Sequence, residues 1–284
     1  MLSLVMATIG RTEEVGRMIQ SLVNQNGRNF ELIIVDQNLD DRLASYIETG
    51  IAQGIDIRHV RLDRPSLSAA RNLGISLARY EILAFPDDDC WYESTVIEHI
   101  CNHFDSAPET GGVVARWVEQ AEGLGRTEAS GQLSLRAWRR FRGGEGSSIS
   151  LFFRRKLFDA LGGFDERLGI GRWYGSGEET DFLLRALASG ARLDYAPGAR
   201  VHHHFSTEQS GDWRTICRNI RNRARGTGAI YAKHQLDSFV VIRGCSAPFL
   251  WLLLKLRSPK YVVRSWCLVI GRVEGFVRWK LQEK

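Results

Sequence analysis

The sequence predicts an α/β fold, in which a mostly parallel sheet flanked by helices is followed by a helical, basic C-terminal tail. Two observations carry this prediction. Between Leu2 and Phe85, apolar runs of strand length alternate with segments of helical spacing, and such alternation indicates a parallel sheet covered by helices. From Arg214 to Lys284, fifteen Lys and Arg face three acids, a net charge of +12, whereas the rest of the chain nets −7.

The first part of the chain is expected to form a regular strand–helix alternation. The expected strands are Leu2–Thr8, Phe30–Val35, Ile55–Leu62 and Ile82–Phe85. The expected helices are a segment capped by Thr12 with apolar Val15, Met18, Ile19, Leu22 and Val23, then Asp40–Gln53 and Leu67–Ala78. The last strand ends before Pro86, because proline lacks the N–H that a central strand donates.

The second part of the chain is less regular. The expected helices are Trp91–Ala107, Arg154–Leu161 and Glu178–Ala188, and the expected strands are Gly112–Glu119, Ser147–Phe153, Arg192–Ala196 and Ala199–His203. Loops are expected at Glu122–Gly146, which is glycine-rich and basic, and at Phe164–Ser176. In the tail, Arg214–His234 is expected to be a basic helix, and Ser238–Lys284 alternates apolar runs with arginines.

Three consecutive aspartates, Asp87, Asp88 and Asp89, follow the last strand of the first part. The carboxyl end of a strand is where open α/β sheets bind ligands. Adjacent carboxylates repel one another, and a bound divalent cation offsets this repulsion. Mg²⁺ and Mn²⁺ prefer hard oxygen ligands and pair with diphosphates. The alternatives are a surface acidic turn or a helix N-cap at Asp89.

The cysteines and the N-terminus indicate the compartment. The five cysteines are scattered without a CxxC pair, which argues against a zinc site or a disulfide framework and fits a reducing compartment. The first residues carry no basic segment and are expected to form a strand, not a signal peptide. The tail has no apolar run of about 18 residues, the length that spans a membrane.

A set of short motifs follows in order along the chain. They are Ala7-Thr8 with Arg11; Ile34-Val35-Asp36; Leu67 to Gly74 (LSAARNLG); Leu83 to Asp89 (LAFPDDD); Phe153-Arg154-Arg155 with Gly162 to Glu166 (GGFDE); Gly177 to Asp181 (GEETD); and Val201-His202-His203. No single motif is specific, but the ordered set resembles the inverting family 2 glycosyltransferases with the GT-A fold. The resemblance covers roughly Leu2 to His204, and no strong motif covers the tail.

The resemblance implies a GT-A-like catalytic domain over residues 1–211, with a nucleotide-sugar half at about 1–115 and an acceptor half at about 116–211. Residues 212–284 form the helical, basic tail. The implied reaction moves a sugar from a nucleotide-diphosphate sugar to an acceptor hydroxyl with inversion, using Mg²⁺ or Mn²⁺. The acceptor would be a glycan or a lipid-linked molecule in bacterial cell-surface glycan synthesis.

The resemblance also assigns residues to the donor. The nucleotide-sugar set is Ala7, Thr8, Arg11, Asp36, Arg71, Asp87 and Asp88, and the metal set is Asp89 and His203. Asp36 would bind the nucleobase, and its alternative is an Asx turn or a helix cap. Arg11 and Arg71 suit a diphosphate, because guanidinium groups bind oxyanions in pairs of hydrogen bonds; the alternative is a surface ion pair.

The resemblance assigns the acceptor side to the Gly177–Asp181 motif. Gly177 and Glu178 would contact the acceptor, and Glu179 would be the catalytic base. The family pattern usually has Glu-Asp where this chain has Glu178-Glu179, so the longer Glu179 occupies the base position. Asp181 is the alternative base, although pairing with Arg185 is the more expected role. A plain acidic helix start, favoured by the helix dipole, remains an alternative for the whole motif.

Three adjacent histidines follow Val201. Strand alternation places His202 and His204 on one face and His203 on the other. The family pattern points to His203 as a metal or diphosphate contact. The sequence leaves open which of the three is the ligand.

Other functions remain open at this stage. The tail suits an anionic membrane surface or a helical lid on the catalytic domain, and no nucleic-acid partner is expected. The expected location is cytoplasmic, with possible attachment to the inner face of the cell membrane. A sugar-phosphate nucleotidyltransferase and a non-catalytic glycan- or membrane-binding protein are the alternative functions.

Overall fold

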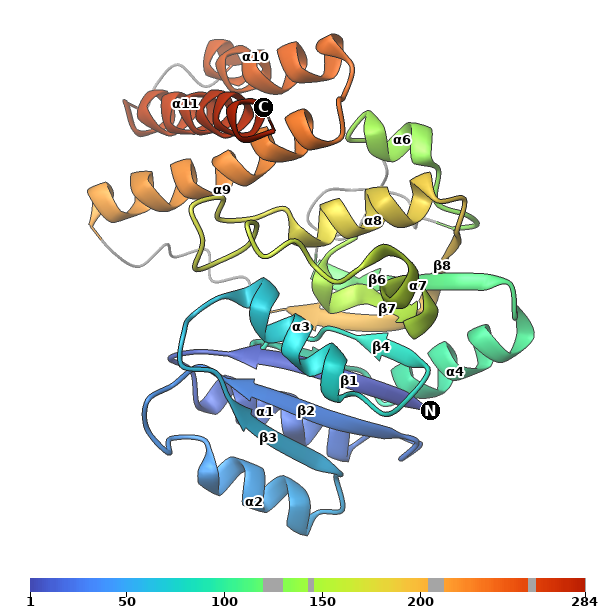
Figure 1. The fold of residues 1–284 in the computed structure, drawn as a ribbon. Coiled ribbons are helices and arrows are strands. Elements are labelled where there is room, and N and C mark those ends of the chain that lie inside the picture. The colour runs from blue at the N-terminus through green and yellow to red at the C-terminus, as the bar shows by residue number, and fades with distance from the viewer. Residues whose placement is uncertain (120–129, 143–145, 204–211, 255–258, 284) are drawn as a thin grey trace.

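The computed structural model describes residues 1–119, 130–142, 146–203, 212–254 and 259–283 (Figure 1). Its strands are β1 (Leu2–Thr8), β2 (Phe30–Asp36), β3 (Ile57–Arg61), β4 (Ile82–Ala84), β5 (Cys90–Tyr92), β6 (Thr110–Trp117), β7 (Leu151–Arg154) and β8 (Arg192–His203). Its helices are α1 (Glu13–Val23), α2 (Ala44–Ala52), α3 (Leu67–Leu77), α4 (Val96–Ser106), α6 (Leu135–Arg139), α7 (Arg155–Leu161), α8 (Glu178–Ala188), α9 (Trp213–Lys233), α10 (Ser238–Leu254) and α11 (Pro259–Gln282), with a 3₁₀ turn η1 (Ser148–Ser150).

The strands form one sheet in the order β3-β2-β1-β4-β7-β6-β8-β5. The first four strands in this order run parallel, as predicted. Strand β7 runs antiparallel to both β4 and β6, whereas β6 and β8 are parallel. Because β1, β2 and β4 are parallel neighbours, their carboxyl ends meet at one edge of the sheet, where Thr8, Asp36 and the three aspartates follow.

Helices cover both faces of the sheet and bury one apolar core on each (Figure 1). Alternation along each strand sends side chains to opposite faces. In β1, Leu4 and Met6 join the core under α1 and α4, whereas Val5 joins the core under α3, α7 and α8. Strands β1, β2 and β4 are therefore buried on both faces, which is typical of parallel sheets, whereas β3 at the edge of the sheet is partly exposed.

The structure corrects several expected elements. Residues 90–92 are a strand rather than the start of a helix, because Cys90, Trp91 and Tyr92 pair with β8; the helix-cap alternative for Asp89 is therefore wrong. The two expected strands near His203 are one strand, β8, whose ladder with β6 absorbs Pro197-Gly198 through a register shift.

Three further boundaries differ from the prediction. Helix α2 begins at Ala44, later than Asp40. The strand expected from Ser147 begins at Leu151, because Ser147 and Ser150 close a capping box around η1. The loop expected at Glu122–Gly146 contains α6, capped by the Ser134 hydroxyl, and its residues 122–129 and 143–145 lie outside the described ranges.

The described part of the tail forms the helices α9, α10 and α11, and the backbones of α9 and α11 approach each other closely. A Cβ atom added at Gly275 would lie 2.0 Å from the Arg225 carbonyl oxygen, and one at Gly271 would lie 2.4 Å from that of Arg221. Trp279 of α11 is 1% exposed and belongs to the same core as α8. The inner side of the tail is thus part of the folded body.

The outer side of α11 carries an exposed apolar row, called here the outer stripe. Its members are 40–66% exposed and, from Val263 on, recur every three or four residues: Val262, Val263, Trp266, Ile270, Val273, Val277 and Leu281. Such spacing places them on one side of a helix. Among the described residues, no helix combines the length and the apolarity needed to cross a bilayer.

Candidate active site

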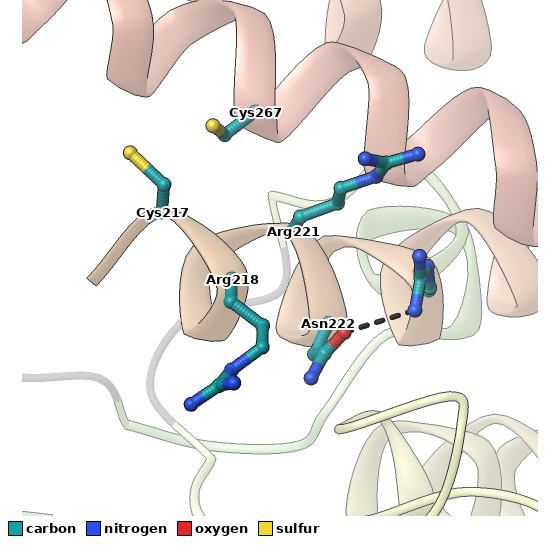
Figure 2. Close-up of a pocket in the computed structure, with 6 residues that line it drawn as sticks. Cys217, Arg218, Arg221, Asn222 and Cys267 are labelled. Carbon is teal, nitrogen blue, oxygen red and sulfur yellow. Dashed lines mark hydrogen bonds between the residues drawn. The ribbon is translucent and has the colours of Figure 1, made fainter. Parts of the chain in front are cut away.

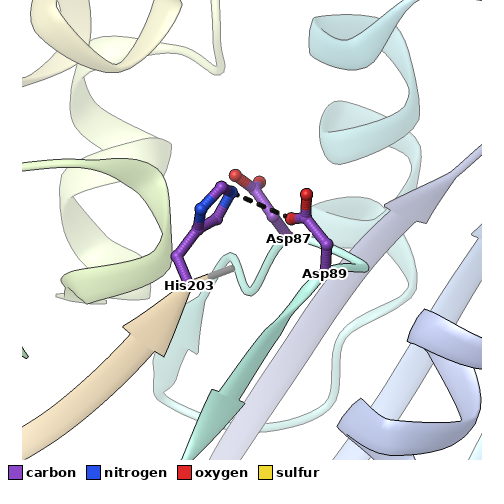
Figure 3. A group of neighbouring side chains, drawn as sticks. All are labelled: Asp87, Asp89 and His203. Carbon is purple, nitrogen blue, oxygen red and sulfur yellow. Dashed lines mark ion pairs between the residues drawn. The ribbon is translucent and has the colours of Figure 1, made fainter. Parts of the chain in front are cut away.

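The aspartates after β4 lie beside His203 because of strand pairing. Cys90 is the ladder partner of His203 between β5 and β8, so the residue before Cys90 reaches the histidine ring. His203 Nε2 lies 3.0 Å from Asp89 Oδ1. Donor atoms of Asp87, Asp89 and His203 all lie within 4.8 Å of one another, and the three side chains point toward a common centre (Figure 3).

Charge around Asp89 favours its ionised form. Burial acts to raise its pKa, but the hydrogen bond with His203 and the Arg11 guanidinium together hold the pKa of Asp89 below its usual value. Burial acts to lower the pKa of His203, and Asp89 more than offsets this, so the pKa of His203 is raised. His203 and Arg11 thus favour the carboxylate form of Asp89.

Asp88 turns away from this group toward β1. Its Oδ2 accepts a hydrogen bond of 2.7 Å from the Thr8 hydroxyl, and Arg11 Nε lies 3.4 Å from its Oδ1. Burial raises the pKa of Asp88 to about 6, against the opposing effect of Arg11. Thr8 and Arg11, predicted from the first motif, therefore meet the aspartates directly.

Asp36 lies at the same edge of the sheet but forms a separate hydrogen-bond network. Its carboxyl is fully buried, and Oδ1 accepts from the Asn38 N–H at 2.9 Å, which is the Asx turn named as an alternative. Oδ2 lies 3.0 Å from His59 Nε2 of β3. This turn shapes the loop after β2, where Asn38 Oδ1 also accepts from the Gly10 N–H.

Arg71 of α3 lies between the aspartates and α8. Its side chain is 1% exposed. One terminal nitrogen, Nη2, donates to Asp87 Oδ1 at 2.9 Å, and the other, Nη1, donates to Glu178 Oε1 at 3.1 Å. One buried side chain thus links the first turn of α8 to Asp87.

Glu179 follows Glu178 in the first turn of α8. Helix geometry separates the two directions by about 100°. The residue is partly exposed, but its Oε2 lies away from solvent and has no hydrogen-bond partner among the described residues. Burial, assisted by the neighbouring Glu178 carboxylate, raises the pKa of Glu179 to about 8. A carboxylate with a raised pKa is a stronger proton acceptor once it is ionised.

The carboxyl group of Asp181 is held inside the fold by basic side chains. Its carboxyl is fully buried and lies 2.9 Å from Arg185 Nε, 2.7 Å from Lys233 Nζ and 2.8 Å from His234 Nε2. Although burial acts to raise it, these partners lower the pKa of Asp181. The pair with Arg185 is the one that the sequence led us to expect, and the other two partners come from the end of α9.

The loop before α8 positions the acidic turn. Gly177 is the N-cap of α8 and has a φ of +100°, a left-handed conformation that favours glycine. A Cβ there would lie 3.0 Å from Ile230 of α9. The tail therefore packs directly against the start of α8.

The structure adds contact residues that the sequence motifs missed. Ser148 donates to Asp87 Oδ1 at 3.2 Å, and Trp117 packs edge-to-face on His203 with ring centres 5.5 Å apart. His202 stacks on Trp91 and contacts Glu119 at 2.7 Å, on the side of the strand away from Asp89. His204 lies outside the described residues. No local pattern marks Ser148 or Trp117, since both contacts join distant segments.

A family comparison fits this arrangement. The model of Glycosyl transferase family 2 matches residues 3–162, more than half of the chain. The chain belongs to glycosyltransferase family 2. The matched segment of this family 2 chain contains the aspartates and Arg71 but ends before the acidic turn of α8 and before His203.

Relatives carry glycosyltransferase names. The putative glycosyltransferase EpsH of Bacillus subtilis is 29% identical over 125 residues, 44% of this family 2 chain and 36% of that protein. The pre-mycofactocin glycosyltransferase of Mycobacterium tuberculosis is 29% identical over 206 residues, 69% of this chain and 41% of that protein. A glucosyl-dolichyl phosphate glucuronosyltransferase of Haloferax volcanii is 25% identical over 217 residues, 72% of this chain and 68% of that protein. The chain spans less than half of the first two relatives.

Solved structures show the same fold. The mannosyltransferase PcManGT of Pyrobaculum calidifontis, in complex with GDP-Man and Mn²⁺, superposes with a TM-score of 0.66 at 14% identity and covers 100% of this chain and 87% of that one. S. aureus TarS 1-349 in complex with UDP-GlcNAc has a TM-score of 0.59 at 13% identity and covers 99% and 92%. The expected GT-A fold of this family 2 chain is confirmed.

Proposed function

We propose that this chain transfers one sugar from a nucleotide-diphosphate sugar to an acceptor hydroxyl, with inversion at the reacting carbon. Arg71 carries the proposal: its guanidinium contacts Asp87 at 2.9 Å and Glu178 at 3.1 Å. A single buried side chain thus lies between the candidate diphosphate site and the residue next to the candidate base. A one-step displacement requires a leaving group and a proton acceptor held at such a fixed separation.

Asp87, Asp89 and His203 would hold the divalent cation. Their donor set is two carboxylates and one imidazole within 4.8 Å. Carboxylates suit both Mg²⁺ and Mn²⁺, and the imidazole favours Mn²⁺, because Mg²⁺ binds through oxygen ligands. A bound cation would neutralise charge on the leaving diphosphate. The Mn²⁺ and GDP-Man in the PcManGT structure support this choice.

The remaining donor contacts follow from the geometry of the sheet edge. Arg11 has a side chain 40% exposed, so it can move from Asp88 and Asp89 to an incoming diphosphate. Thr8, Ala7 and Asp36 line the ends of β1 and β2, where the nucleoside would lie. Asp36 would act through the loop that it shapes with Asn38 as well as through its own carboxylate.

On the acceptor side, Glu179 would remove the proton from the attacking hydroxyl. Its carboxyl has no structural partner at Oε2 in the described part of the chain, in contrast to Asp181, whose carboxyl contacts three basic side chains. Gly177 and Glu178 would line the acceptor path. This division treats residues 1–211 as catalytic and residues 212–284 as the tail.

The acceptor would belong to a cell-surface glycan and be carried on a lipid. The outer stripe of α11, together with the basic excess of the tail, supports attachment to an anionic membrane surface. The name of the Haloferax volcanii relative includes a dolichyl phosphate, which is a lipid-linked group. The five free cysteines fit the reducing, inner side of that membrane.

The direct test is a thermal-shift and calorimetric screen of UDP- and GDP-sugars with and without Mn²⁺. We expect one nucleotide class to stabilise the protein only when the metal is present, since a ligand that binds the folded state raises its apparent stability. Asp89→Ala should abolish the metal-dependent part, and the exposed Asp40→Ala should not. Equal nucleotide binding by wild type and Asp89→Ala in Mn²⁺ would rule the proposal out.

A further inference from the structure

A groove lined by arginines runs along one face of α9, outside the proposed catalytic site (Figure 2). Its volume is about 390 Å³. Its lining residues are Cys217, Arg218, Arg221, Asn222 and Arg225 of α9 and Cys267 of α11. Cys217 and Cys267 lie across from each other between the two helices, on the side of this arginine groove that faces α11 (Figure 2).

The arginine groove carries more positive than negative charge. Arg221 Nε and Arg225 Nε both donate to Glu274 Oε2, at 2.9 and 2.8 Å. One carboxylate thus serves two guanidinium groups. No carboxylate of the described residues lies within ion-pair distance of the third, Arg218. Glu274 therefore already neutralises part of the charge of Arg221 and Arg225. In the described part of the chain, the unpaired positive charge is that of Arg218, an exposed residue at which an anion would gain electrostatic energy.

Hydrogen-bond donors in the arginine groove are also available. Arg225 Nη1 donates to Asn222 Oδ1 at 2.9 Å. The amide nitrogen of Asn222 takes no part in this hydrogen bond. Within the described ranges, the Arg218 guanidinium, Nη1 of Arg221 and Nη2 of Arg225 donate no hydrogen bond. Several planar donor groups around one cavity match the oxygens of a phosphate, which accepts more such bonds than a carboxylate.

The arginine groove borders an apolar surface. Cys267 lies four residues after Val263 and three before Ile270, so the three share one side of α11. Val263 and Ile270 belong to the outer stripe, and each is 40% exposed. A ligand with its anionic group in the groove would therefore lay an attached apolar chain on the stripe.

The arginine groove is also connected to the acceptor side of the active site. The Gly175 N–H donates to the Asn222 carbonyl oxygen at 3.0 Å, and the Arg225 guanidinium lies over the Trp173 ring at 4.3 Å. Residues 173–177 lead directly into the first turn of α8, which carries Glu179. The same face of α9 thus lines the groove and supports the loop of the proposed base.

We propose that the arginine groove binds the phosphate group of a lipid phosphate whose apolar chain lies along the outer stripe. Assigning this lipid as the carrier of the acceptor rests on the proposed glycosyl transfer. The groove and the stripe then hold the carrier, and the acceptor hydroxyl faces Glu179. This placement gives the tail a specific ligand in addition to a general membrane affinity.

The test is calorimetric titration of the full chain with dodecyl phosphate below its micelle concentration. Inorganic phosphate and dodecyl maltoside serve as the phosphate-only and chain-only probes. We expect dodecyl phosphate to bind at one site, more tightly than either partial probe, and to slow labelling of Cys267 by N-ethylmaleimide. Arg218→Gln should weaken this binding about tenfold, as loss of one charged hydrogen bond does. Arg223→Gln, an exposed arginine of α9 outside the groove, should change it by less than about twofold.

Each other outcome has a defined meaning. Equal binding of inorganic phosphate and dodecyl phosphate would show that no lipid chain takes part, and equal binding of dodecyl maltoside would show that no phosphate is recognised. An equal loss of dodecyl phosphate affinity in Arg218→Gln and Arg223→Gln would show that the ligand responds only to the overall positive charge of the tail, not to a specific site. Mn²⁺-dependent nucleotide binding, measured on the same samples, reports separately on the proposed transferase. If nucleotide binding persists while dodecyl phosphate fails to bind, the proposed lipid phosphate site is wrong and the proposed glycosyl transfer is unaffected.

Discussion

The carboxyl group of Glu179 is held in a position where ionisation is costly. It lies beside Glu178, whose charge is already paired with Arg71, and part of it is removed from water. The consequence is a pKa of about 8. Proximity to a like charge and burial are the two causes that raise carboxyl pKa values in proton-transferring sites.

Glu179→Gln should lower turnover about 100- to 10,000-fold, the usual effect of losing a general base. Nucleotide affinity in Mn²⁺ should persist, because the cation ligands are other residues. Wild-type turnover should rise with pH toward about 8, as Glu179 ionises. Steady-state rates and calorimetry measure the two effects. Retained turnover in Glu179→Gln, together with an inactive Asp181→Asn, would transfer the role of base to Asp181.

The same substitution should stabilise the fold in a pH-dependent way. The pKa of Glu179 is about 8 in the folded state, against about 4.3 in an unfolded chain. The folded protein therefore binds the extra proton, and the wild type loses stability as pH rises between those values. Glutamine cannot ionise, so the melting temperature of Glu179→Gln should exceed that of wild type by more at pH 8 than at pH 5.

Thermal unfolding of both proteins across this range measures the difference. Glu178→Gln is the control, because it loses the Arg71 ion pair and should lower the melting temperature instead. A Glu179→Gln difference that stays constant with pH would contradict the assigned pKa.

The sequence identified those candidate site residues that belong to short, recognisable motifs. The aspartates end a strand, and the ordered motifs selected Asp89, His203 and Arg71, which the structure brings together or links through one contact. The sequence motifs did not identify Ser148 or Trp117, because the contacts of these residues depend on strand register. The roles assigned to the donor and acceptor residues stay predictions, since geometry alone does not measure them.

At the scale of elements, the strands and helices with clear periodicity were found within a few residues. Helix α8 has the predicted bounds, and α3 differs by one residue. Strand β5 was missed because three residues show no period, and its existence depends on pairing with β8. The tail helices α10 and α11 were seen only as apolar runs with arginines, because their outer faces are apolar as well.

The contact between α9 and α11 predicts which glycine tolerates a side chain. Gly275→Ala places a methyl group against the Arg225 carbonyl, where a Cβ would come within 2.0 Å. The helices must separate, and overpacking of this kind costs about 1–3 kcal/mol. Gly27→Ala, with nothing within 4 Å of its Cβ, is the matched control. Denaturant unfolding compares them, and equal stability of the two variants would disprove the close approach.

At the scale of the molecule, the acidic body and the basic tail have different surfaces. We expect the full chain to co-sediment with vesicles containing phosphatidylglycerol and to be released by salt, because added ions screen surface charge. Trp266→Asp should weaken this binding, since it places a charge in the outer stripe. Leu39→Asp, at a residue 90% exposed outside the tail, should not. Binding that ignores both salt and Trp266→Asp would favour a tail that acts only as a packed lid.

The close approach of α9 and α11 has a consequence for the protein in a lipid environment. Gly228, Gly271 and Gly275 bring backbone against backbone, with Arg272, Arg221 and Arg225 as the facing residues. Contacts of this kind arise from van der Waals packing of small residues, which does not depend on excluding water. Hydrocarbon chains can replace contacts between apolar side chains, but they do not weaken the close packing of these two backbones. The helix pair should therefore stay assembled when detergent or lipid covers the outer stripe, so the arginine groove would keep its shape at a bilayer surface.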